Sequence, residues 1–565
     1  MINNLNKGVI YMGFLSLSVR EAMENINATH NGWFLPAVQR PYVWGSRYES
    51  EKYICKLFDS ILRGYPIGTL IVWNSDKEIP YRCFIEDFSD GDTAQFVDKN
   101  LWKREDKWLV YDGQQRLQTL FSCLKYTLNG RILTYNLFFD LNNHDDAEAT
   151  GFEFVNKNSI LKPGIIAMSQ LFIQADDSKV KYRKNLETII PPEIMNGNEE
   201  QFENIVDKLW DIFIRKDVKS LAFFPIEKGW DEDRVNDVFQ RLNMGGVPLS
   251  GADLLLSRIK EKSYDYEEKL QLEAKQIFAI TQGYVIETSS ILQIIHFIIK
   301  RTNRISPERV KDHELKEFIS VFDDLKGSLD DFFKHFIYDA FKINNNSIVI
   351  RGGALYPLIV YVYNRDKKGV PYRKIDNDNL LRMKQYFILS QLNDWNTQTI
   401  INECSSLALD ADVDFPLDAI KEFVGKNNRL TSLNISSIEG YIWFPLKILI
   451  PDVSYISSDT VAGRYKPELD HIFPMKLSGR PADYNVNVLW NMQPVTGVVN
   501  ASKGNTHPKT FFSSPTNSKY INCYNFMPDD LSALEWSDHN LFINYRKQKM
   551  IDFMLSKYGI TITPN

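Results

Sequence analysis

Cysteine is scarce in this 565-residue sequence, and the cysteines lie far apart: Cys55, Cys83, Cys123, Cys404 and Cys523. Their odd number and the lack of any C-x-x-C pair argue against a disulfide framework, a zinc site or a dithiol redox centre. We therefore expect buried, small apolar cysteines in a reducing compartment, and we predict a cytoplasmic location.

Long apolar runs are missing as well. The most apolar windows, residues 291–299 and 354–362, are only about half as long as a membrane-spanning helix. The first 26 residues contain no basic segment followed by an uninterrupted apolar stretch, so no secretion signal is expected. We predict a globular protein without a membrane partner.

An excess of positive charge is also absent, because 66 Lys and Arg stand against 72 Asp and Glu, a formal net charge of −6. Any contact with nucleic acid must therefore come from a local basic surface. Apolar material is plentiful, with 44% hydrophobic and 13% aromatic residues. The length and this composition predict two to four domains with buried cores.

Changes in the pattern divide the chain into three predicted domains, 1–260, 261–440 and 441–565, and indicate an α+β multidomain fold. The first shows short apolar runs mixed with helical periodicity, the second is helical, and the third returns to short strands. The expected helices cover about 19–26, 51–62, a segment starting after Gly113, and 541–558. The expected strands cover 69–73, 108–111 and 134–139.

The third domain holds the strongest chemical pattern. Hydrolysis of a phosphodiester near neutral pH needs a base, a cation and rigid placement of both. His471 suits the base, while Asp470 points the opposite way on a strand and can bind a hard cation together with Asn500. Lys503, one helical turn beyond Asn500, can meet a phosphate. Taken alone, however, such Asp-His pairs also arise by chance.

The full set resembles the HNH (ββα-metal) nuclease family in order and spacing: an acidic-His-Ile-x-Pro strand, an Asn-hydrophobic-Leu strand, then Asn-x-x-Lys opening a helix. The resemblance implies that His471 is the general base, that Asp470 and Asn500 bind Mg²⁺ or Mn²⁺, and that Asn487 pins the loop that orients His471. It also places Lys503 in the catalytic site.

The last metal position stays open between two residues. The family often has His there, whereas this chain has Asn500, and His507 lies close enough to compete. Residues 464–519 also hold seven Lys and Arg against three Asp and Glu, a local excess of four positive charges. This stretch is a candidate phosphate-facing surface, although such an excess is often only a solvated face.

Two segments stand out near the N-terminus. In residues 110–120 (VYDGQQRLQTL), a strand feeds Asp112-Gly113 and then a helix, so backbone N–H groups and Arg116 could cradle a phosphate. An ordinary Asp-Gly turn explains the same pattern. In residues 34–44 (FLPAVQRPYVW), Tyr42 and Trp44 could stack on a base or pack into the core.

A third segment, residues 238–250 (VFQRLNMGGVPLS), places Asn243 and two glycines after a helix. Glycines there permit a left-handed backbone or the close approach of a ligand. An ordinary helix C-cap explains them equally well.

Together the three segments, over residues 15–260, resemble the ParB/sulfiredoxin-like N-terminal domain of the GmrSD type IV restriction enzymes. With the helical middle and the HNH unit, nearly the whole chain resembles the single-chain enzymes of this type. The resemblance implies a domain that binds and hydrolyses a nucleoside triphosphate (GTP, UTP, CTP or ATP). It assigns the nucleotide to Asp112, Gly113, Gln114, Gln115 and Arg116, with Gln39 and Arg40 next to them. Candidate DNA or nucleotide contacts beyond these are Tyr42, Trp44, Asn243 and His507.

The sequence therefore predicts an NTP-regulated, metal-dependent endonuclease that cuts or nicks modified, double-stranded phage DNA. It leaves a homodimer open, as well as the modification and the preferred nucleotide. Two alternatives remain: a DNA-sensing NTPase that does not cleave, and a toxin nuclease that acts on RNA or on host DNA.

Overall fold

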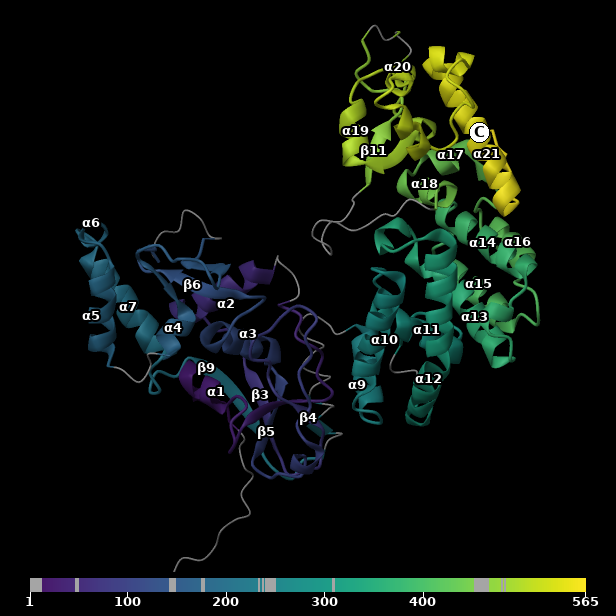
Figure 1. The fold of residues 1–565 in the computed structure, drawn as a ribbon. Coiled ribbons are helices and arrows are strands. Elements are labelled where there is room, and N and C mark those ends of the chain that lie inside the picture. The colour runs from purple at the N-terminus through teal and green to yellow at the C-terminus, as the bar shows by residue number, and fades with distance from the viewer. Residues whose placement is uncertain are drawn as a thin grey trace, which may run out of the picture. The chain divides into compact units, whose positions relative to one another are not determined.

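The computed structural model describes residues 13–45, 50–141, 149–173, 178–231, 234, 235, 238, 250–306, 310–451, 467–478, 481 and 484–564. Its contacts divide the chain into two compact units, Met1–Tyr264 and Asp265–Asn565 (Figure 1). The structure is 53% helical with several small sheets, which agrees with the predicted mixture of helix and strand. The predicted boundary at 260 lies just before this division, and the one at 440 falls inside the second unit.

A six-stranded mixed sheet forms the centre of the first unit. Neighbouring strands pair antiparallel, parallel, antiparallel, parallel and antiparallel along the sheet. Their order is β1 (Leu15–Leu17), β9 (Leu221–Ile226), β3 (Leu70–Ser75), β5 (Lys107–Asp112), β2 (Trp33–Pro36) and β4 (Tyr81–Arg82).

This sheet is buried on both faces. Because side chains alternate along a strand, Leu70 and Val72 pack into one core while Ile71 and Trp73 pack into another. Strand β5 divides in the same way, with Val110 in the first core and Tyr111 in the second. The end of β5, where the predicted phosphate-binding turn begins, is thus held from both sides.

A second, antiparallel sheet and a set of helices complete the first unit. The sheet runs in the order β7 (Phe152–Asn156), β6 (Arg131–Asn136) and β8 (Ile165–Ala167). The helices are α1 (Val19–Asn25), α2 (Ser50–Arg63), α3 (Gln114–Lys125), α4 (Met168–Ile173), α5 (Lys179–Ile189), α6 (Pro192–Met195), α7 (Glu199–Phe213) and α9 (Gly251–Lys260). Helix α1 starts at a capping box, in which Ser18 and Glu21 bond to each other's backbone N–H.

The second unit begins with packed helices and matches the predicted helical middle region. They are α10 (Tyr266–Thr281), α11 (Thr288–Lys300), α12 (Leu315–Asp331), α13 (Tyr356–Lys367), α14 (Asn377–Leu392), α15 (Gln398–Asp410), α16 (Leu417–Lys426), α17 (Ile435–Glu439) and α18 (Trp443–Leu449). A π-helical stretch, Phe332–Asp339, continues α12.

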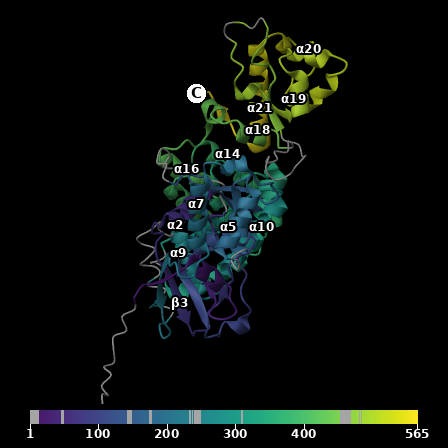
Figure 2. The same ribbon diagram turned by 90° about the vertical axis from the view of Figure 1, so that its left-hand side faces the viewer.

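The rest of the second unit carries two short strand pairs and three helices. Strand β11 (Pro467–His471) pairs antiparallel with β12 (Met492–Thr496), and β10 (Leu433–Asn434) pairs in parallel with β13 (Ile562–Thr563). Helices α19 (Gly497–Lys503), α20 (Pro508–Ser513) and α21 (His539–Tyr558) lie close to one another in both views (Figures 1 and 2). Short 3₁₀ turns cover Lys99–Leu101, Asp312–Glu314, Asn346–Ile348, Gly352–Leu355, Tyr372–Lys374, Leu489–Asn491, Ser518–Cys523 and Leu534–Ser537.

Helix α21 joins the C-terminal part to the helical part. Gln385 of α14 donates to the carbonyl of Tyr558 at 2.9 Å, and the Tyr558 hydroxyl donates to the carbonyl of Ile448 at 2.8 Å. The bond from Gln385 and the bond from the Trp490 indole to Glu439 link residues 265–440 to residues 441–565, in keeping with their place in one unit.

Two expectations from composition meet different outcomes. Within the described ranges every helix is too short or too polar to cross a membrane. All five cysteines are free, and Cys123 and Cys404 are buried as expected. Cys523 is exposed, however, because it ends a 3₁₀ turn at the surface, so the expectation of uniformly buried cysteines is wrong there.

Candidate functional site

Strands β11 and β12 and helix α19 form the C-terminal candidate site. His471 lies opposite Met492, and Asp470 lies opposite Gln493 in the antiparallel register. The chain then turns directly into α19, which Thr496 caps by accepting a hydrogen bond from the Val499 N–H. Since side chains alternate along β11, Asp470 and His471 point to opposite faces.

Asp470 is 3% exposed, and both of its carboxylate oxygens are engaged. Lys503 Nζ donates to Oδ1 at 2.9 Å, and the Tyr524 hydroxyl donates to Oδ2 at 2.8 Å. Lys503 also donates to the carbonyl of His471 at 2.8 Å. Burial lowers the pKa of Lys503, and the facing Asp470 carboxylate opposes that effect. The structure thus brings Asp470 and Lys503 together as a buried ion pair.

His471 faces Asn487 on the other side of β11. The distance between His471 Nε2 and Asn487 Oδ1 is 3.1 Å. An amide oxygen can only accept, so Nε2 carries the hydrogen and Nδ1 of the neutral ring keeps its lone pair. Asn487 therefore orients the imidazole ring directly through its side chain.

Asn500 contacts a carboxylate that the sequence prediction did not include. Its Nδ2 donates to Glu468 Oε2 at 2.8 Å, and Glu468 is exposed on the same face of β11 as Asp470. Residues 500 and 503 of α19 thus pair with residues 468 and 470 of β11. This face presents carboxylate and amide oxygens, the ligand atoms that hard cations prefer.

Asn491 pins the loop after β11, and the sequence prediction missed it. Its fully buried amide donates to the carbonyls of Phe473 and Val486 and accepts from the Phe473 N–H, each at 2.9 Å. The prediction gave the loop-pinning role to Asn487, which instead bonds to the imidazole. Both asparagines lie in the same N-V-N-V-L-W-N stretch, so the residue types alone did not separate them.

Arg546 of α21 braces the strand pair from behind. It is fully buried and donates to the carbonyls of Trp490 and Met492 at 2.6 and 3.2 Å, and to Gln493 Oε1 at 3.0 Å. Burial lowers its pKa to about 9. Nothing local to Arg546 in the sequence signals this role, because its partners on and next to β12 lie more than 50 residues away.

His507, the alternative metal ligand, lies at the N-terminal end of α20. Its ring packs edge-on against Phe473, with 5.1 Å between ring centroids. Burial lowers the pKa of His507, so the ring stays neutral over a wider pH range. The ring therefore has an apolar neighbour, whereas Asn500 lies in the cluster of polar side chains on α19 and β11.

The N-terminal candidate site begins where β5 passes into α3. Gly113 adopts φ = +87°, and a Cβ there would lie 2.2 Å from Leu70 Cδ2. Only glycine suits this turn, after which the first residues of α3 contact the loop 39–44 through their side chains. Gln114, Gln115 and Gln39 then hold that loop by donating to the carbonyls of Arg40, Pro41 and Tyr111 at 3.0, 3.0 and 2.7 Å.

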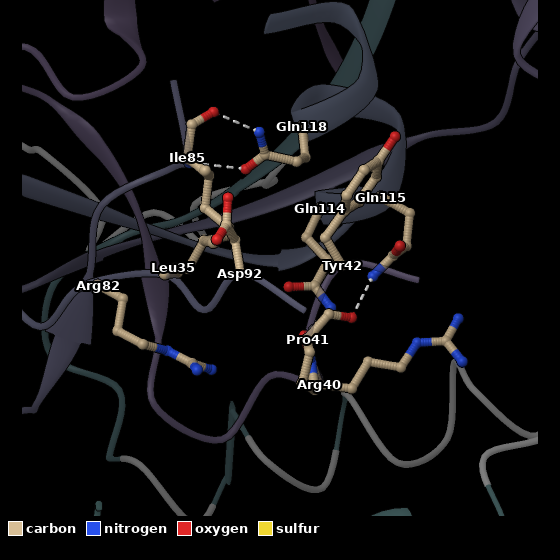
Figure 3. A pocket seen from close by; sticks show the side chains of 11 residues that line it. Leu35, Arg40, Pro41, Tyr42, Arg82, Ile85, Asp92, Gln114, Gln115 and Gln118 are labelled. Atoms are coloured by element: carbon tan, nitrogen blue, oxygen red, sulfur yellow. Dashed lines mark hydrogen bonds between the residues drawn. The ribbon is translucent and has the colours of Figure 1, made fainter. Parts of the chain in front are cut away.

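A small pocket lies between this loop and α3 (Figure 3). Arg40 extends beside it, and among the described residues its guanidinium has no hydrogen-bonding or ionic partner. Arg82 is buried and donates to the carbonyl of Gln39 at 2.7 Å. The lining comprises Leu35, Arg40, Pro41, Tyr42, Arg82, Ile85, Asp92, Ala94, Gln114, Gln115 and Gln118.

Two predicted members of this site, Arg116 and Asp112, lie outside the lining of the pocket. Arg116 donates to the carbonyls of Ile67 and Thr69, the latter at 3.0 Å, and pairs with Asp112 at 3.2 Å. Burial lowers the pKa of Arg116, and Asp112 opposes that effect. The guanidinium thus fixes the backbone before β3.

The predicted aromatic contacts belong to the core. The Tyr42 hydroxyl bonds to Thr119 Oγ1 at 2.6 Å and its ring packs on Phe88, while Trp44 packs partly buried against the first core. Asn243 lies outside the described residues.

Residues 20–260 match the GmrSD restriction endonuclease N-terminal domain. The matched region contains the Gln39–Trp44 loop, the Asp112–Arg116 turn and the pocket between them. It confirms the part of the predicted resemblance that concerns the N-terminal domain. The strand pair β11–β12 lies outside the region that matches the GmrSD N-terminal domain.

The chain is also similar to an uncharacterized protein of Methanocaldococcus jannaschii. The two are 25% identical over 348 residues, which cover 55% of this chain and 56% of the relative. The chain thus spans about half the length of the relative that it matches. Because this relative is uncharacterized, its similarity indicates no activity for the chain.

Proposed function

We propose that this protein is a restriction-type DNA endonuclease whose hydrolytic centre lies on β11, β12 and α19. The observation that carries the proposal is the bond between His471 Nε2 and Asn487, which leaves Nδ1 free to accept a proton. Two strands followed by a helix, with His471, Asn500 and Lys503 in these places, are the arrangement that the HNH resemblance predicts.

His471 acts as the general base in this proposal. Its Nδ1 takes a proton from the water that attacks the phosphodiester, a role that typically contributes about 10² to 10⁴ in rate. Asn487 keeps the ring in the required tautomer, and Asn491 fixes the loop that follows His471. Rigid placement of the ring limits the reorganisation needed during the reaction.

The oxygen donors on the Asp470 face of β11 fit a divalent cation. Asp470, Glu468 and Asn500 offer oxygen ligands, and Asp470 Oδ1 already binds a cationic group, the Lys503 ammonium. Within the described parts of the chain no three His, Cys, Asp or Glu side chains form a metal-binding group. The assignment of the cation to Asp470 and Asn500 follows from the HNH resemblance. When bound, Mg²⁺ or Mn²⁺ neutralises charge on the phosphate and on the leaving oxygen.

The N-terminal unit is proposed to be a ParB/sulfiredoxin-like domain that binds and hydrolyses a nucleoside triphosphate along the loop 39–44 and the start of α3, around the small pocket of Figure 3. Arg40 is the cation best placed for its phosphates, because its guanidinium has no other partner among the described residues. Gln39, Gln114 and Gln115 shape the loop, while Asp112, Gly113 and Arg116 shape the helix start.

The proposed target is double-stranded, modified phage DNA, with nucleotide binding controlling cleavage in the cytoplasm. The matched domain family supports this choice through its description as a restriction endonuclease domain. A panel of phage and plasmid DNA, with and without modification, NTP and metal, identifies the target. Cleavage of tRNA or of unmodified host DNA alone would favour a toxin instead.

The decisive variant is His471→Ala. DNA cleavage in the presence of Mg²⁺ or Mn²⁺ should fall by about 10² to 10⁴ because the proton acceptor is lost. Nucleotide turnover and the thermal transition should stay near those of the parent. The exposed His313 in the same unit provides the control, since His313→Ala should cut at the parental rate. Parental cleavage by His471→Ala would refute the assignment of the base.

A further inference from the structure

Asp470 already carries a cation in this structure. Lys503 Nζ lies 2.9 Å from Asp470 Oδ1, and the two side chains are 0% and 4% exposed. The ammonium therefore lies on the oxygen that a metal ion at Asp470 would use. Tyr524 covers the other oxygen at 2.8 Å, so Oδ1 is the atom at which an exchange of cations can take place.

We propose that Asp470 is one cation-binding position that the Lys503 ammonium and a divalent metal ion occupy alternately. Entry of the metal displaces Lys503, and the freed ammonium turns toward the DNA phosphate. This inference rests on the proposed nuclease function, but it concerns the state of the centre before substrate arrives.

Electrostatic repulsion is the first reason that the Lys503 ammonium and a divalent ion cannot both remain at Asp470. Two buried cations, Lys503 and Arg546, already surround the single carboxylate of Asp470. A divalent ion beside an ammonium at about 4 Å would experience strong repulsion in a site shielded from water. Because Arg546 is held by three backbone carbonyls and Gln493, Lys503 is the cation that can leave.

The position of Lys503 in its helix permits that movement. It is the last residue of α19, and Gly504 follows with φ = +49°. No further turn of α19 follows, so the four-carbon side chain can rotate outward without breaking the helix. Asn500 lies one turn earlier on the same helix, where its Nδ2 donates to Glu468 Oε2 at 2.8 Å.

Two consequences distinguish this arrangement from a purely structural ion pair. The metal-free centre is stabilised by its own lysine, so the apparent metal affinity equals the intrinsic affinity multiplied by the fraction of molecules in which Lys503 has left Asp470. Lysine release and metal entry are also the same event, so the reactivity of the amine reports on occupancy by the metal.

Amine labelling of the parental full-length chain tests the proposal. Without metal, Lys503 should resist acetylation by a water-soluble reagent, and saturating Mn²⁺ should raise its labelling about tenfold or more, read by mass spectrometry. Lys107 is the matched control, because it is buried with Nζ bonded to three carbonyls and should stay protected throughout. Unchanged labelling of Lys503 at saturating Mn²⁺ would overturn the proposal.

Metal titration of variants provides the second test. Lys503→Met removes the competitor, so Mn²⁺ should bind about tenfold tighter and should raise the thermal transition more than in the parent. Lys503→Met combined with Asp470→Asn should lose that gain. If Lys503→Met binds Mn²⁺ no more tightly than the parent, the two cations do not compete.

The two hypotheses fail in different ways. A parent that binds Mn²⁺ and exposes Lys503 but cuts no DNA contradicts the nuclease function and leaves the exchange intact. A parent that cuts DNA with Mn²⁺ while Lys503 stays protected contradicts the exchange alone. Absence of any Mn²⁺ binding contradicts both.

Discussion

A single buried amide, Asn491, holds the loop on which the proposed base depends. It makes three hydrogen bonds of 2.9 Å with the backbone on either side of the loop. Buried backbone groups that lose such partners cost free energy, because water cannot replace them. The loop therefore depends on this side chain more than on any surface contact.

We expect Asn491→Ala to lower the free energy of unfolding of the second unit by about 2–4 kcal/mol. Cleavage should fall as well, because the loop after His471 loses its anchor. Denaturant unfolding and a plasmid cleavage assay measure the two effects. Asn505 is exposed, and Asn505→Ala is the control that should change neither. A fully stable Asn491→Ala would contradict the pinning role.

Arg40 and Arg116 are a matched pair with opposite expectations. Arg40→Ala should weaken nucleotide binding about tenfold or more at unchanged stability, since the guanidinium forms no hydrogen bond or ion pair with a described residue. Arg116→Ala should instead destabilise the first unit by about 1–3 kcal/mol, because it removes bonds to Ile67 and Thr69.

Calorimetric titration with a nucleoside triphosphate and thermal unfolding separate the two arginines. The assignment of Arg40 fails if Arg116→Ala alone abolishes binding while the protein remains as stable as the parent.

At the scale of elements, the contact between α10 and α12 contains an acid whose ionisation opposes folding. Burial, with a smaller contribution from Asp330, raises the pKa of Glu273 to about 7, and Lys326 partly offsets this. Glu273 Oε1 is buried without a hydrogen-bonding partner among the described residues. The folded state therefore holds a proton that the unfolded state releases at its ordinary, lower pKa.

The stability of the second unit should consequently decrease as pH rises from about 4.5 to 7 and stay lower above that range. Glu273→Gln should flatten this dependence and raise the free energy of unfolding at pH 8 by about 1–3 kcal/mol. Urea unfolding at pH 5 and pH 8 measures this pH dependence of stability. Glu317 is exposed, so Glu317→Gln is the control. An identical pH profile for parent and Glu273→Gln would contradict the shift.

Local pattern predicted some elements well and others not at all. Helices α1, α2, α3 and α21 and strands β3 and β5 lie where periodicity and turn residues indicated, and β6 begins about three residues earlier than predicted. Strand β9 was missed, although it lies between β1 and β3 in the main sheet. Its partners are about 150 or more residues away and it contains Pro225, so no local signal reveals the pairing.

The candidate site also contains residues that local pattern indicated and residues that depend on distant partners. Local pattern indicated that Asp470 and His471 lie on a strand and that Asn500 and Lys503 lie on the following helix, and their catalytic and metal-binding roles stay predictions. Tyr524 and Arg546 were not predictable, because only tertiary packing brings them to β11 and β12. In the first unit, residue types suggested a phosphate clamp at Arg116, and only the structure shows that its guanidinium bonds to the backbone before β3.

At the scale of the whole molecule, the two units carry two different proposed ligands. A ligand that binds only the folded form stabilises it in proportion to its concentration over the dissociation constant, by about 2.7 kcal/mol at a hundredfold excess. Calorimetry of the full chain should show two transitions. Nucleoside triphosphate should raise the one belonging to the first unit, and Mn²⁺ the other.

Arg40→Ala and Asp470→Asn assign these transitions, since each should abolish one shift and leave the other. A single transition that responds equally to both ligands would show that the two units unfold together, and it would contradict the assignment of one ligand to each.

The bracing of β12 by Arg546 also orders events during protein synthesis. A ribosome that has just added His471 must add residues 472–546 before the guanidinium can reach the carbonyls of Trp490 and Met492. At common translation rates this takes about 4–15 s. Throughout that interval the nascent chain carries every proposed catalytic side chain in turn without the support that fixes their strand. A chain cut short before α21 therefore lacks the side chain that braces β12.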